Sequence, residues 1–110
     1  MINTFQEYQE ATAKTAIYPK HRAIEYCVVG LAGESGELAG KYSKVIRDDK
    51  EQISEERRQA MLYEMGDVFW FLSELSTSLG YTLQEVANTN INKLQDRYNR
   101  GKLSGEGDLR

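Results

Sequence analysis

The stretch Leu31-Ala-Gly-Glu34-Ser-Gly-Glu37-Leu-Ala39 places two carboxylates three residues apart in a small and mostly apolar segment. A second stretch, Met61-Leu-Tyr-Glu64-Met-Gly-Asp67-Val-Phe-Trp-Phe-Leu72, repeats the spacing. Residues three apart share one face of an α-helix, so each pair of acids points the same way. The apolar neighbours favour burial of that face. The sequence therefore predicts two helices that aim four carboxylates at an interior.

Buried carboxylates of this kind need compensation. An ionised carboxylate without a partner costs several kcal/mol to bury, and neighbouring like charges repel each other. A hard divalent cation supplies the compensation, and carboxylate oxygens without His or Cys suit Mg²⁺, with Mn²⁺ as a substitute. The alternative is that the acids lie on solvated helix faces, which is common for Glu.

Glycines surrounding the acids favour the metal site over solvated faces. Each glycine costs roughly 0.8–1 kcal/mol relative to Ala in a helix interior. We therefore expect a neighbouring helix or a ligand to approach these backbones closely. The five glycines are Gly30, Gly33, Gly36, Gly40 and Gly66.

Composition limits the classes of protein that are possible. The chain has 110 residues, of which 40% are hydrophobic and 28% charged, as expected for one soluble globular domain. The net charge of −3 argues against a nucleic-acid binder. No apolar run is long enough to cross a membrane, and the N-terminus does not resemble a signal peptide. Cys27 is the only cysteine, which favours a reducing cytoplasm.

Periodicity and capping signals predict an all-α, four-helix bundle-like domain over residues 1–100, followed by a mobile glycine-rich tail over 101–110. The two acid-bearing helices are joined by a short charged connector, so we expect them to lie antiparallel with their motifs face to face. The predicted helices run from Phe5 to Ile17, from Arg22 to Arg47, from Glu55 to Ser78, and from the capping box at Thr82 to Arg100.

The ordered motifs resemble the MazG-like all-α nucleotide pyrophosphohydrolases, in the short single-domain form. Glu-x-x-Glu followed by Glu-x-x-Asp on a second helix carries the resemblance, and further blocks extend it over nearly the whole chain. These blocks are Ala16-Ile-Tyr-Pro19, Lys41-x-x-Lys44-x-x-Arg47-Asp48, Asn90-Ile-x-Lys93-Leu-x-x-Arg97-x-x-Arg100-Gly101 and Gly105-x-Gly107-Asp108-x-Arg110. The resemblance implies Mg²⁺-dependent hydrolysis of a nucleoside triphosphate to the monophosphate and pyrophosphate. It also implies a homodimer or homotetramer.

Candidate site residues follow from the motifs and the resemblance. Glu34, Glu37, Glu64 and Asp67 are the expected metal ligands, and Glu37 or Glu34 is a candidate general base. The candidates for holding phosphate are Lys41 and Lys44, which follow Glu37 on the same helix face, with Arg47, Lys93 and Arg97. The candidates for holding the nucleoside are Tyr18, which matches an aromatic of related enzymes, Phe71, Gln9, and Asn90, which interrupts an apolar stripe.

Three other interpretations compete with this one. A di-iron bundle requires Glu-x-x-His on two helices, and the single histidine lacks that context. A hydrolase acting on phosphoribosyl-ATP shares the fold. A non-catalytic module that binds a nucleotide or a partner helix belongs to another functional class, although the presence of all four acids argues against lost activity.

Overall fold

The computed structural model describes residues 1–110 as four α-helices and one short 3-10 helix, without β-strands. The elements are α1 (Phe5–Ala13), η1 (Lys20–Arg22), α2 (Ala23–Asp48), α3 (Glu55–Ser78) and α4 (Leu83–Asn99). The predicted all-α class and the four helices are confirmed, and α2, α3 and α4 lie within one residue of their predicted bounds. No helix is both long enough and apolar enough to span a bilayer.

Hydroxyl caps explain why the sequence locates the helix starts so well. The side-chain oxygens of Thr4, Ser54 and Thr82 each accept a hydrogen bond from the backbone N–H three residues further on, at 3.0–3.2 Å. Such a bond satisfies one of the N–H groups that a helix leaves unpaired at its start. At the other end of α3, Gly80 adopts φ +82°, a left-handed conformation that glycine takes without strain.

Helix α1 is shorter than the sequence predicts, since it ends at Ala13 instead of Ile17. The hydroxyl and the backbone N–H of Thr15 both donate to the carbonyl of Thr12, each at 3.1 Å. This local bonding replaces the helical pattern with a turn. The chain beyond the turn then buries Tyr18 before η1 begins.

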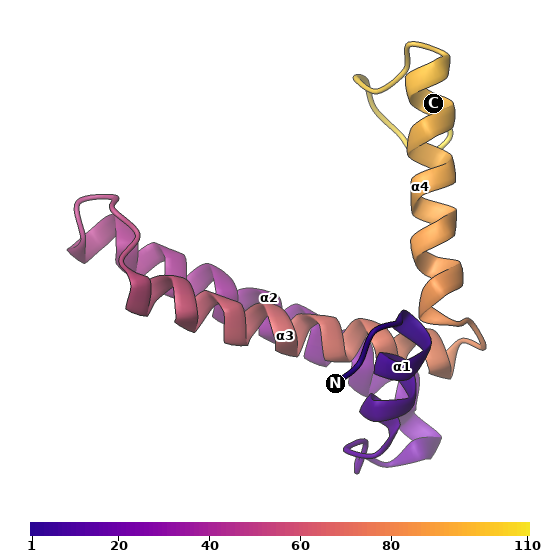
Figure 1. The fold of residues 1–110 in the computed structure, drawn as a ribbon, viewed down its shortest axis with the longest axis horizontal. Helices are drawn as coiled ribbons and strands as arrows, with labels where there is room; N and C mark the ends of the chain where they lie inside the picture. Colours follow the sequence, from indigo (N-terminus) through magenta and orange to yellow (C-terminus); the bar gives the residue numbers. More distant parts are fainter.

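Helices α2 and α3 form a long antiparallel hairpin and lie side by side along most of their length (Figure 1). Their connector contains two non-glycine residues in the left-handed region, Lys50 at φ 53° and Glu51 at φ 62°. Arg57 on α3 stabilises it by donating from Nε to the Asp49 carboxylate at 2.7 Å. The face-to-face arrangement of the two acid-bearing helices is as predicted.

Helix α1 packs across the end of the hairpin through aromatic and polar contacts. The ring of Tyr8 stacks on Phe69 of α3, with 4.6 Å between their centroids. Beside it, the Glu74 carboxylate of α3 is 2% exposed and accepts hydrogen bonds from the Thr12 hydroxyl at 2.8 Å and the Tyr18 hydroxyl at 2.7 Å. Buried polar hydrogen bonds therefore supplement the aromatic contacts between α1 and α3.

Helix α4 projects away from the hairpin, so the four helices do not close a bundle within one chain (Figure 1). It packs against α1 and α3 but not against α2. Its start is held by Gln9 of α1, whose Nε2 donates to the Thr77 hydroxyl at 2.8 Å and whose Oε1 accepts the N–H of Leu83 at 2.8 Å. The bundle-like packing expected from the sequence is thus limited, in the single chain, to α1, α2 and α3.

The open arrangement leaves little apolar core. The radius of gyration is 16.8 Å, compared with about 13 Å for a compact chain of this size. The buried apolar side chains are only Tyr18, Cys27, Val45 and Leu83. Many large apolar side chains of the helices are exposed instead, among them Val28, Ile46, Leu62, Met65 and Ile91.

The glycine-rich tail over residues 101–110 folds back along α4 (Figure 1). Arg97 is 5% exposed and donates from a guanidinium nitrogen to the carbonyl of Asp108 at 2.6 Å. Arg100 donates to the carbonyl of Arg110 at 2.7 Å. Hydrogen bonds to α4 therefore hold the tail against that helix in this structure, and the mobility expected from the sequence stays a prediction.

Candidate metal and nucleotide site

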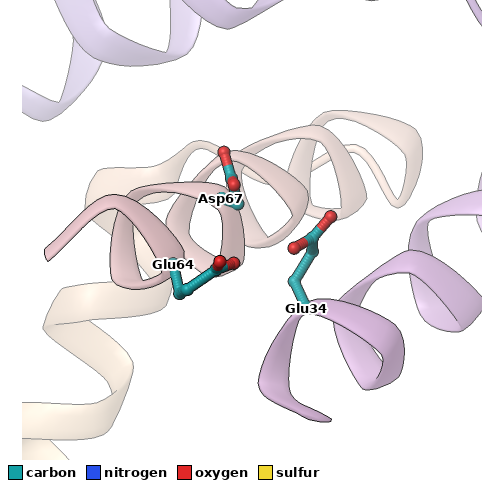
Figure 2. A group of neighbouring side chains, drawn as sticks. All are labelled: Glu34, Glu64 and Asp67. Atoms are coloured by element: carbon teal, nitrogen blue, oxygen red, sulfur yellow. The ribbon is translucent and has the colours of Figure 1, made fainter. Parts of the chain in front are cut away.

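Three acids converge between the two helices of the hairpin. Glu34 comes from α2, and Glu64 and Asp67 come from α3. One carboxylate oxygen from each lies within 4.8 Å of the other two. Figure 2 shows the carboxylates approaching one another from the facing helices. The side chains of Glu34 and Glu64 are half-buried and that of Asp67 is exposed.

Glu37 does not belong to this close group. It lies one turn after Glu34 on α2, and its side chain is exposed. The structure therefore brings together three of the four predicted ligands. Because Glu37 shares a helix face with Glu34, it remains near enough for its charge to act on that carboxylate.

Mutual repulsion among the acids marks the site electrostatically. The pKa of Glu34 is raised above its ordinary value by burial, then by the charges of Asp67, Glu64 and Glu37. Lys41 offers partial compensation, with Nζ at 3.7 Å from Oε1 of Glu64. The three neighbouring carboxylates are thus accompanied by one nearby ammonium group, that of Lys41.

The donor set fits a hard divalent cation. All the donors are carboxylate oxygens, and neither His21 nor Cys27 belongs to the group. Oxygen ligands of this type suit Mg²⁺ or Mn²⁺ better than Zn²⁺ or copper. The raised pKa of Glu34 indicates that a positive charge at this position would relieve an existing cost.

The basic residues predicted to hold phosphate divide between two regions. Lys41 and Lys44 line a hollow of about 680 Å³ near the connector of the hairpin, together with Arg57. Arg47 is exposed beside it and bonds to Asp48, with 2.8 Å from Nε to Oδ1. This guanidinium lowers the pKa of the Asp48 carboxyl.

The remaining phosphate candidates and Asn90 are on α4, and the chain by itself does not bring them to the acids. Asn90 and Lys93 line an open groove of about 610 Å³ along α4. Arg97 is buried and bonds to the tail. The assignments of Asn90, Lys93 and Arg97 to the nucleotide remain predictions.

Two of the nucleoside candidates make internal contacts in this structure. Tyr18 is 8% exposed, and its ring stacks on that of Tyr26 with 4.8 Å between centroids. Burial and the hydrogen bond to Glu74 raise the pKa of its hydroxyl. Gln9 uses its amide to hold the start of α4. Neither side chain faces open space near the acids, so their roles toward a nucleoside also remain predictions.

Phe71, the fourth nucleoside candidate, borders an apolar hollow of about 360 Å³ together with Tyr26, Val29 and Gly30. Gly30 is one turn before Glu34 on α2, and Phe71 is one turn after Asp67 on α3. The hollow therefore adjoins the acidic group on both helices.

Sequence reasoning named Phe71 as a nucleoside candidate but missed Tyr26 and Val29 of this lining, and it also missed Glu74. The signal for the hollow was present, because Tyr26, Gly30 and Glu34 recur at a spacing of four residues on one helix face. Glu74 sits in a run of small and apolar residues, from Phe71 to Ser76, where a buried carboxylate needs hydrogen-bond donors. The donors come from α1 and the following turn, which sequence spacing alone does not bring to α3.

Comparisons with known proteins agree with this geometry. Residues 22–101 match the model of the MazG nucleotide pyrophosphohydrolase domain. The chain is 40% identical over 109 residues to the Gene 37 protein of Mycobacterium phage L5, and the alignment covers 94% of this chain and 96% of that protein. No solved structure matches it. The matched region contains the converging acids and three of the four helices, and the chain therefore belongs to the MazG nucleotide pyrophosphohydrolase family.

Proposed function

We propose that this chain is a Mg²⁺-dependent pyrophosphohydrolase that converts ribo- or deoxyribonucleoside triphosphates to monophosphates and pyrophosphate. Family membership supports the class of activity. The single observation that carries the assignment to a site is the convergence of the Glu34, Glu64 and Asp67 carboxylates within 4.8 Å. A structural helix pair has no need to place three acids together at this cost.

The three converging carboxylates would hold the cation. A bound divalent ion would neutralise charge on phosphate oxygens and make water more acidic. Lys41, next to Glu64, is placed to interact with an outgoing phosphate, and Lys44 continues the same helix face. Arg47, further along α2, is a candidate for the same task.

Hydrolysis requires a base near the acidic group. Water adds its oxygen to the α-phosphorus, the bond from that phosphorus to the bridging oxygen breaks, and pyrophosphate leaves. Glu37 is exposed and lies one turn from Glu34, so it is a candidate to orient the water and accept its proton. Glu34 itself is the other candidate, and in that case Glu37 would complete the metal ligands.

The nucleoside would occupy the hollow bordered by Phe71 and Tyr26. Its apolar lining suits a base, and its position one turn from the acids on both helices suits a nucleotide whose phosphates reach them. Tyr18 would then support the base indirectly, through its stack on Tyr26.

A second copy of the chain would cover the exposed apolar residues of the hairpin. The expanded radius of gyration and the small buried core support a homodimer or homotetramer. In such an assembly, Asn90 and Lys93 of one copy are candidates to meet the acids of another, since α4 extends away from its own hairpin (Figure 1).

The test is pyrophosphate release from the eight common nucleoside triphosphates, with Mg²⁺ and with EDTA. Asp67→Asn and Glu37→Ala should each lower kcat at least a hundredfold, because the first removes the charge of a proposed metal ligand and the second removes a candidate base or metal ligand. Glu10→Gln on α1 is the matched control and should keep full activity. Tight nucleotide binding without turnover of any triphosphate would instead favour the non-catalytic nucleotide-binding module.

A further inference from the structure

Charged residues line one end of the apolar hollow. Arg22, Glu25, Tyr26, Val29 and Gly30 all line it. Glu25, Tyr26, Val29 and Gly30 lie on one face of α2, in line with Glu34, and Arg22 is the N-cap residue directly before the helix. At 1.5 Å per residue, Glu25 lies about 14 Å along the helix from Glu34. From Glu34 toward the start of α2, this face carries first the apolar lining of the hollow and then the charged pair of Arg22 and Glu25.

Contacts within the chain hold the aromatic walls of the hollow. Gly30 allows the Phe71 ring to lie against the backbone of α2, where a Cβ atom would overlap it. Tyr26 is stacked on Tyr18 at an interplanar angle of 17°, and Tyr18 is held by Glu74. A flat aromatic ligand would therefore meet aromatic side chains from both α2 and α3 that other residues already hold in place.

The ion pair of Arg22 and Glu25 at the end of the hollow is exposed, so either side chain can bind a ligand instead. Arg22 Nη2 and Glu25 Oε2 are 2.8 Å apart, and their side chains are 63% and 67% exposed. An exposed ion pair contributes little to stability, so a ligand can replace it at little cost. The Arg22 guanidinium offers several N–H donors, and the Glu25 carboxylate beside it offers two acceptor oxygens.

We propose that Arg22 and Glu25 select the nucleobase of the triphosphate and favour guanine or cytosine. This inference rests on the proposed function and on placement of the base in the hollow. Guanine presents two adjacent N–H donors to a carboxylate and an oxygen to a guanidinium. Cytosine presents two adjacent acceptors to a guanidinium and an amino group to a carboxylate. Each base makes three hydrogen bonds to the pair, whereas adenine, uracil and thymine make two with their pairing edges.

The experiment compares kcat/KM for the eight nucleotides in the wild-type protein and in two variants. If guanine is preferred, Glu25→Gln should lower its kcat/KM relative to adenine about tenfold, since one acceptor becomes a donor. If cytosine is preferred, Arg22→Gln should have the corresponding effect. Glu55→Gln is the matched control, because Glu55 forms the same type of exposed pair with Arg58, at 3.2 Å. The control should leave the ranking unchanged.

A wild-type preference for adenine, uracil or thymine would overturn the inference, as would a ranking that neither variant changes. Absence of turnover for every nucleotide would count against the proposed function alone. The base ranking would then be read from calorimetric dissociation constants of the same eight nucleotides with Mg²⁺. A binding preference for guanine or cytosine that one of the two variants removes would support the selection, and equal binding of all bases would contradict it.

Discussion

At the scale of single residues, Glu74 shows how a buried acid contributes to packing without a cationic partner. Its carboxylate accepts hydrogen bonds from Thr12 and Tyr18, which belong to α1 and to the segment after it. Hydrogen bonds to charged groups contribute about 1.5–3 kcal/mol each, and an orphaned buried donor costs further free energy. Glu74 therefore fastens the N-terminal part of the chain to α3.

Glu74→Gln should lower the free energy of unfolding by about 2 kcal/mol, because an amide replaces a charged acceptor with one acceptor and one donor. Urea unfolding followed by circular dichroism measures the change. Glu85→Gln, at an exposed position on α4, is the control and should change stability little. Equal midpoints for the two variants would contradict the role assigned to Glu74.

Gly30 is the one helical glycine of the acidic motifs that another side chain approaches closely. The sequence predicts close approach at all five glycines, whereas Gly33, Gly36, Gly40 and Gly66 have no atom near a Cβ position within the chain. The expectation is therefore confirmed at Gly30. No atom of the chain approaches the Cβ position of the other four, and approach of a ligand to them stays a prediction.

Gly30→Ala should destabilise the protein by about 1–3 kcal/mol, because the added methyl group overlaps the Phe71 ring. Gly33→Ala is the matched comparison and should stabilise α2 by about 1 kcal/mol through helix propensity alone. Thermal unfolding of both variants without nucleotide measures the two changes in stability. Stabilisation by both substitutions would show that the ring of Phe71 moves aside freely.

At the scale of elements, the acids that meet between α2 and α3 repel one another and destabilise the hairpin. The raised pKa of Glu34 means that its ionised form is disfavoured in the folded chain. A carboxyl group whose pKa is raised on folding contributes stability at low pH, and this contribution is lost as the pH rises through the folded pKa. At neutral pH the hairpin is therefore less stable than it would be with the charge removed.

Glu34→Gln should raise the melting temperature in EDTA at pH 7 because it removes one charge of the cluster. Mg²⁺ should raise the melting temperature of the wild-type protein by mass action, and this effect should be smaller in Glu34→Gln. Differential scanning calorimetry with and without Mg²⁺ measures both quantities. Equal stabilisation of the two proteins by Mg²⁺ would place the ion elsewhere.

At the scale of the whole molecule, the open shape is the main departure from the predicted bundle. Helix α4 leaves the hairpin after Leu83, and large apolar side chains such as Val29, Leu62 and Tyr63 are more than half exposed. Exposed apolar area of this extent is typical of surfaces that bind another protein.

We expect light scattering at micromolar concentration to give a mass two or four times that of the 12.6 kDa chain. The physical reason is that association removes the exposed apolar side chains from water. Dilution should lower both the mass and the melting temperature, because unfolding is then linked to dissociation. A stable 12.6 kDa monomer at all concentrations would contradict the proposed assembly.

Local chemistry in the sequence is enough to predict the four helices, the bounds of α2, α3 and α4, and the three acids that converge. Hydroxyl caps at Thr4, Ser54 and Thr82 mark helix starts, and an i, i+3 spacing places acids on one helix face. Three further outcomes appear only in the folded chain: Glu37 lies outside the close group, Tyr18 is buried on Glu74, and α4 projects outward (Figure 1). They depend on contacts between residues far apart in sequence, whose geometry no local spacing specifies.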